Sequence, residues 1–97
     1  MESAALYFNL GSAYYKTGNY QASKKYFTRV MDYPDKRALA EFNLGMIALK
    51  QDDEKRALSH FKYAQANSSD KKIVDAATRT IAGLTGTGKR WGAYVLA

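Results

Sequence analysis

The chain of 97 residues contains no cysteine, one proline and one histidine. Without cysteine it can form neither disulfides nor thiolate metal sites, a composition compatible with the cytosol and with the periplasm. A single histidine excludes most clustered metal sites and most catalytic triads. Because proline breaks helices, its scarcity favours long ones.

Long apolar runs are also missing, so the sequence predicts no transmembrane helix, and no basic segment followed by an apolar stretch marks a signal peptide. Hydrophobic residues make up 46% of the chain and charged residues 25%, which suits one small folded domain. The formal net charge of +6 favours acidic partners but does not select among them.

A tetrapeptide occurs twice in the chain. Phe8-Asn9-Leu10-Gly11 returns 34 positions later as Phe42-Asn43-Leu44-Gly45. This spacing is the period of a helix–turn–helix repeat. Stacked helix pairs form a surface rather than a reaction centre, so the repeat favours binding over catalysis.

Periodicity and capping residues predict five helices, at about residues 3–16, 20–31, 36–50, 54–67 and 71–84. Gly18 permits the left-handed turn that often ends a helix, and Asp35 and Asp53 are the expected N-caps of the third and fourth helices. A Gly-rich linker follows the fifth helix. The last eight residues are aromatic and β-branched, a composition typical of a strand.

Two sets of residues in the same register identify a family. Repeat one carries Tyr7, Leu10, Gly11, Tyr14, Ser23 and Phe27, and repeat two carries Leu44, Gly45, Ala48, Ala57 and Phe61. With this pattern the chain resembles a tetratricopeptide repeat protein. It departs from the pattern at Glu41, where an aromatic residue belongs, and at Asp52, where a glycine usually stands between the helices.

The resemblance predicts an all-α fold, a right-handed superhelix of about five antiparallel helices with a non-helical tail. Residues 1–84 would form the repeat domain, with repeats at about 4–35 and 38–69 and a capping helix at 71–84. The linker and apolar tail would occupy residues 85–97. We expect Gly11 and Gly45 to permit close helix approach, and Phe27 and Phe61 to fill the space between repeats.

The resemblance also implies a concave groove lined by the first helix of each repeat. Carried over by position, its residues are Ala5, Phe8, Asn9, Ser12, Tyr15 and Lys16 in repeat one, and Leu39, Phe42, Asn43, Met46, Leu49 and Lys50 in repeat two. In many family members the asparagine position hydrogen-bonds the backbone of a bound peptide. So apolar a groove predicts a site for a peptide or partner helix, unless the fifth helix and the curvature of the stack cover it.

The tail allows a second interpretation. Trp91, Tyr94 and Leu96 could occupy the groove of this chain or of a second copy, which would make the protein a self-associating structural adaptor and a possible homodimer. A strand of the Arg-Trp-Gly type after the repeats also resembles bacterial outer-membrane proteins that place periplasmic repeats before a β-barrel. That resemblance predicts that the chain is a fragment of a longer protein and lies in the periplasm. Without the resemblance we expect a cytoplasmic location.

Other functional signals are weak. The stretch Gly83–Lys89 resembles a phosphate-binding loop, but it follows a helix and Arg90 replaces the hydroxyl residue that holds Mg²⁺. Basic residues on the predicted second helices leave weak nucleic-acid binding as a third function; they are Lys24, Lys25, Arg29, Lys55, Arg56 and Lys62. We therefore predict a protein-binding scaffold for assembly that is not an enzyme and has no cofactor and no metal.

Overall fold

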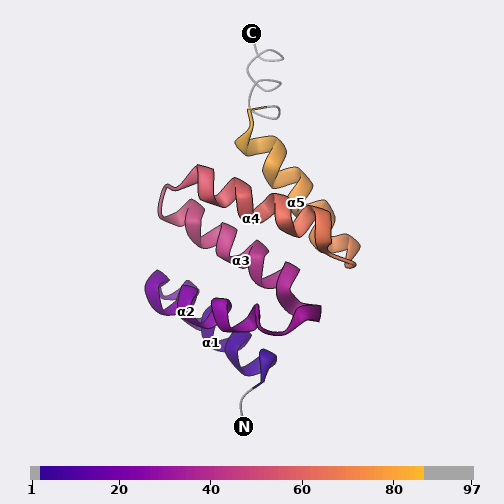
Figure 1. Ribbon diagram of the computed structural model, residues 1–97. Coiled ribbons are helices and arrows are strands. Elements are labelled where there is room, and N and C mark those ends of the chain that lie inside the picture. The colour runs from indigo at the N-terminus through magenta and orange to yellow at the C-terminus, as the bar shows by residue number, and fades with distance from the viewer. Residues whose placement is uncertain (1–2, 87–97) are drawn as a thin grey trace.

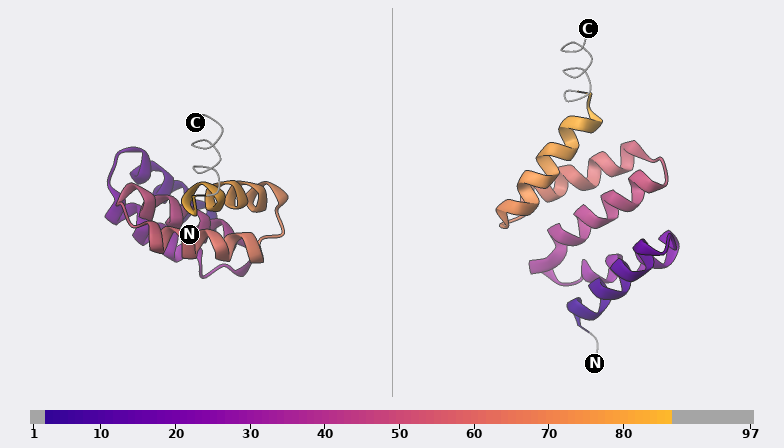
Figure 2. Two further views of the ribbon diagram at one scale, coloured as in Figure 1. Left: turned by 90° about the horizontal axis from the view of Figure 1, so that it is seen from above. Right: turned by 180° about the vertical axis from the view of Figure 1, so that it is seen from behind.

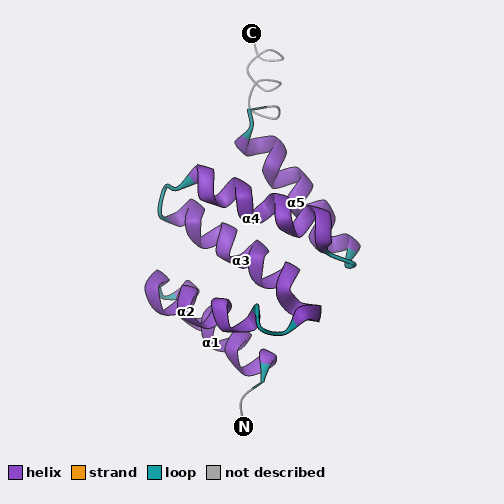
Figure 3. Ribbon diagram, viewed as in Figure 1, coloured by secondary structure: helices purple, strands orange, loops and turns teal. Residues whose placement is uncertain are grey.

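The computed structural model describes residues 3–86, and within that range the chain is helical without a strand. The elements are α1 (Ala4–Lys16), α2 (Tyr20–Val30), the 3₁₀ turn η1 (Pro34–Lys36), α3 (Arg37–Lys50), α4 (Glu54–Asn67) and α5 (Lys71–Leu84). This confirms the expected all-α fold (Figures 1 and 3). The predicted contacts of Trp91, Tyr94 and Leu96 lie outside the described residues.

The helices form a stack in chain order. α1 packs on α2 and α3 on α4 as two antiparallel pairs, α3 joins the pairs by packing on α2, and α5 packs on α4. α1 and α5 therefore lie at opposite ends of the stack (Figures 1 and 2). Each helix buries one side against a sequence neighbour, so the core runs along the stack rather than filling a central globule.

Side-chain caps fix where most helices begin. Ser3 Oγ accepts a hydrogen bond from the Leu6 N–H at 3.1 Å, and Asp53 Oδ1 accepts one from the Arg56 N–H at 3.0 Å. The prediction that Asp35 caps the third helix is wrong, because Asp35 lies inside η1 and Lys36 stands at the N-cap without a side-chain bond. The 3₁₀ turn that begins at Pro34 supplies a backbone acceptor for the first N–H of α3 instead.

The 34-residue register holds at the level of the backbone. Gly18, in the turn between α1 and α2, has φ +82°. Asp52 stands 34 positions later, in the turn between α3 and α4, and has φ +59°. Asn19 and Asp53 are likewise equivalent, and both cap a second helix through the N–H three residues on. Asp52 thus accepts a left-handed conformation that glycine takes more readily.

Within each repeat a glycine lies directly under a phenylalanine ring. A Cβ atom added to Gly11 would stand 2.9 Å from the Phe27 ring, and one added to Gly45 would stand 2.8 Å from Cε1 of Phe61. The Ser23 hydroxyl donates a hydrogen bond of 2.6 Å to the carbonyl oxygen of Gly11 at the same contact. The expected close approach of the paired helices is confirmed.

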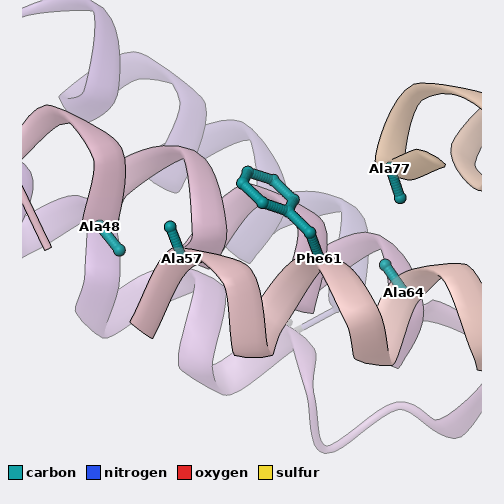
Figure 4. Packing of buried hydrophobic residues seen from close by; sticks show 5 residues of the cluster. All are labelled: Ala48, Ala57, Phe61, Ala64 and Ala77. Atoms are coloured by element: carbon teal, nitrogen blue, oxygen red, sulfur yellow. The ribbon is translucent and has the colours of Figure 1, made fainter. Parts of the chain in front are cut away.

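Each of the two phenylalanines also packs on the helix that follows its own repeat. Phe27 packs with Leu44 and Ile47 of α3, which ties repeat one to repeat two. Phe61 is fully buried in a cluster of four alanines from α3, α4 and α5 (Figure 4), namely Ala48, Ala57, Ala64 and Ala77. Small residues surround the large ring, so the three helices lie close together around it.

The repeats differ at one interior pair of positions. In repeat one Tyr7 stacks on Tyr26 with ring centroids 6.3 Å apart. In repeat two the equivalent residues are Glu41 and His60, and Nδ1 of His60 lies 2.7 Å from Oε1 of Glu41. Glu41 is only 7% exposed. An aromatic contact in one repeat is therefore a polar contact in the other.

Candidate partner-binding face

An open cleft lies between the two repeats, on the side of the first helices. It has a volume of about 210 Å³, and its lining comes from α1, from the end of α2, from η1 and from the start of α3. The lining residues are Ala4, Ala5, Phe8, Asn9, Val30, Lys36 and Leu39. Apolar side chains form the walls, while Asn9 and Lys36 supply the polar groups.

The rest of the predicted groove in repeat one continues along α1. Phe8 is half-buried because its ring meets Phe27 edge to face at 5.6 Å. Tyr15 is also half-buried and packs edge to face on Tyr20 at 5.7 Å. Ser12 is half-buried, and Lys16 is exposed at the last position of the helix.

In repeat two the apolar groove residues are also half-buried, and they lie close to α5. Phe42 meets Phe61 edge to face at 5.2 Å, and together with Met46 and Leu49 it packs against the Phe61 cluster. Ile81 and Leu84 of α5 pack against that same cluster. The fifth helix therefore covers part of this face, and the open cleft lies nearer to α1.

The two groove asparagines are not equivalent. Asn43 is half-buried, and its Nδ2 donates a hydrogen bond of 2.9 Å to the Leu39 carbonyl of its own helix. Asn9 is exposed on the wall of the cleft. Asn9 is therefore the more accessible of the two amides.

Lys50, like Lys16, is exposed at the end of its helix.

A polar network near the start of α3 was missed from the sequence. Besides its contact with His60, the Glu41 carboxylate lies 3.4 Å from the Arg37 guanidinium, which sits 4.7 Å from the centre of the Tyr63 ring. A second cavity of about 310 Å³ opens beside Arg37 and Tyr63, toward the start of α5. The sequence did carry a signal for this network: Glu41 and His60 stand at the positions that Tyr7 and Tyr26 occupy in repeat one.

The basic residues of the second helices are largely exposed, and some of them contact neighbouring side chains. Arg29 lies 5.5 Å from the centre of the Tyr7 ring and Lys25 lies 5.8 Å from that of Tyr26, while Arg56 is 3.7 Å from the Asp53 carboxylate. Within residues 3–86 no group of three or more potential metal ligands comes together. None of the helices in that part of the chain is long and apolar enough to span a bilayer.

The comparisons with known proteins agree with this geometry. Residues 4–36 match the family model of the tetratricopeptide repeat. Neither a curated protein nor a solved structure gives a significant match. Tetratricopeptide repeats generally mediate protein–protein interactions and are typically not enzymes. The family match over the first helix pair, and a second pair that follows it in the same 34-residue register, support a tetratricopeptide repeat protein.

Proposed function

We propose that this chain is a protein-interaction module that holds an apolar segment of a partner protein in the cleft between α1 and α3. The observation that carries the proposal is the cleft itself, which joins groove positions of both repeats in one open cavity. Ala5, Phe8 and Asn9 reach it from the first repeat and Leu39 from the second.

The size of the cleft favours a protein segment over a small molecule. About 210 Å³ is less than the roughly 300–1,000 Å³ typical of small-molecule pockets, but it admits one or two side chains of a peptide. Phe8 and Leu39 are half-buried, so an inserted side chain would remove the rest of their surface from water. Burying a leucine-sized side chain there would contribute at most about 1.5–3 kcal/mol.

Polar groups at the rim would orient the segment. The Asn9 amide is exposed and can both donate to and accept from an extended peptide backbone. Lys36 is exposed on the opposite wall and can pair with an acidic side chain beside the apolar anchor. The preferred ligand is therefore an apolar residue flanked by an acidic one.

A peptide selection tests the proposal. Peptides selected from a random displayed library against the wild-type chain should contain an apolar anchor near an acid, and Ala5→Glu should weaken their binding at least tenfold. Ala5 is exposed, so the substitution leaves the core intact. The matched control is Ser59→Glu, an equally exposed position on α4 that should leave the Kd unchanged. Selected peptides that bind Ala5→Glu as tightly as wild type would place the site elsewhere.

A further inference from the structure

The cleft and the second cavity occupy equivalent places in the repeat register. Four of the seven residues that line the cleft have a counterpart 34 positions later that lines the second cavity. The pairs are Ala4 and Ala38, Ala5 and Leu39, Lys36 and Asp70, and Leu39 and Ile73. The cleft lies between α1 and α3, and the second cavity lies between α3 and α5, with the end of α4 as a further wall. The stack therefore forms one cavity at each junction between successive first helices.

The two cavities also share a wall. Lys36 and Leu39, at the start of α3, line both of them. The starts of α1, α3 and α5 lie along the same side of the stack (Figures 1 and 2). A chain segment that crosses the start of α3 can therefore reach both cavities.

The spacing of the cavities selects a conformation for such a segment. α5 packs against α3, and helices in contact lie about 8–10 Å apart. An extended chain covers this distance in about three residues. In a β-strand the side chains of residues i and i+3 point to opposite faces. In the polyproline II helix, which has three residues per turn, they point to the same face.

We propose that one segment of the partner protein, in the polyproline II conformation, fills both cavities with anchor side chains at positions i and i+3. The inference rests on the proposed function, because the first anchor is the apolar side chain in the cleft. Leu39 forms the wall between the two anchors. A polyproline II segment makes no internal backbone hydrogen bonds, so its amide groups are free to bond with the exposed Asn9 amide.

The second cavity fits a larger and more polar anchor than the cleft does. Its volume is about 310 Å³ against about 210 Å³, and Leu39 and Ile73 give it an apolar wall. Nδ2 of Asn67 donates to the Tyr63 carbonyl at 2.9 Å, which leaves Oδ1 as an acceptor. The charged residues of the lining balance one another; they are Asp35, Lys36, Arg37 and Asp70. The second anchor is therefore an uncharged side chain with an apolar body and a polar end, such as tyrosine.

The peptides selected against the wild-type chain test the second anchor. They should carry a tyrosine-like residue three positions from the apolar one. Replacing this residue by alanine should weaken binding to wild type about tenfold but leave binding to Ser69→Trp unchanged, because the tryptophan already fills the cavity. Ser69 lines the second cavity and is exposed, so the substitution leaves the core intact. The matched control Ser69→Ala should bind like wild type, and circular dichroism confirms that both variants are folded.

Proline and glycine in the peptide test the conformation. Proline at the two positions between the anchors should strengthen binding, because it favours the polyproline II conformation in the free peptide. One glycine inserted between the anchors should weaken binding about as much as loss of the second anchor does. Binding that is lost with proline would show a helical or strand-like ligand and would overturn the proposal.

The same experiments separate this inference from the proposed function. Selected peptides with a single anchor, which Ala5→Glu still weakens and Ser69→Trp does not, would overturn the two-cavity arrangement and leave the cleft as the binding site. A selection that yields no binding peptide would refute both.

Discussion

The contact between Gly45 and Phe61 allows a sharp test, because one methyl group probes it. In Gly45→Ala the new Cβ would stand 2.8 Å from one ring carbon of Phe61 and 3.0 Å from two others. The best separation for such carbon pairs is about 3.5–4.0 Å. Phe61 is fully buried and its ring meets Phe42 edge to face, so it has no free space into which to tilt.

Two opposing terms set the expected effect of Gly45→Ala. Alanine in place of glycine inside a helix gains about 1 kcal/mol of intrinsic propensity. Overpacking of a filled core costs about 1–3 kcal/mol, and three short ring contacts place this site at the upper end. We therefore expect a net loss of about 1–2 kcal/mol of unfolding free energy.

Gly83 provides the matched control. It also lies in a helix, α5, and a Cβ atom added there has no neighbour within 4 Å. Gly83→Ala should therefore keep the propensity gain alone and raise the unfolding free energy by up to about 1 kcal/mol. The same substitution is therefore expected to lower the unfolding free energy at Gly45 and to raise it at Gly83.

Urea unfolding followed by far-UV circular dichroism measures both variants, and thermal melts should shift by roughly 4–8 °C for each kcal/mol. Adding Phe61→Leu to Gly45→Ala should cost less than the two substitutions do separately, because the smaller side chain makes room for the methyl group. If Gly45→Ala stabilises the protein as much as Gly83→Ala does, close approach does not constrain this helix pair and the reasoning fails.

Three further predictions concern single contacts, each measured by urea unfolding. Asp52→Gly should raise the unfolding free energy by up to about 1 kcal/mol, and Gly18→Ala should lower it by about 1–2 kcal/mol, because both positions have positive φ. A change of the same sign in both variants would contradict this. Ser23→Ala should cost only about 1 kcal/mol, the value of one buried hydrogen bond, because repeat two has alanine at the same place. Glu41→Ala and His60→Ala should each destabilise by about 1–3 kcal/mol, with a coupling above about 0.5 kcal/mol in the double variant; strict additivity would show that the two side chains do not interact.

The repeat period allowed most of the architecture to be predicted from the sequence. Gly11 and Gly45 marked the close contacts, and Ser3 and Asp53 marked two helix starts. These signals are local: each depends on a backbone conformation or a steric limit that one residue type satisfies best. The assignment of Asp35 as a cap failed because Pro34 initiates a 3₁₀ turn, and both outcomes fit the same short sequence.

The polar interior of repeat two could not be predicted in the same way. Glu41 was recognised only as a departure from the repeat pattern, because its contacts with His60 and Arg37 depend on the crossing of α3 and α4. The extent of the open cleft could not be predicted from the sequence either. How far α5 covers Phe42 and Met46 depends on how the helices pack, and residue spacing alone does not fix that.

The polar pair of repeat two has a consequence for how the chain folds. If α3 paired with α2 as α1 does, the Glu41 carboxylate would meet Tyr26 instead of His60 and would keep only Arg37 of its own helix as a polar partner. A buried polar group that loses a partner costs about 1–3 kcal/mol, so the exchanged pairing is less stable than the observed one. Two hairpins of similar backbone in one polypeptide can exchange their halves during folding. Here the polar pair of Glu41 and His60 in one repeat and the aromatic pair of Tyr7 and Tyr26 in the other disfavour that exchange, so each helix closes on its own sequence neighbour.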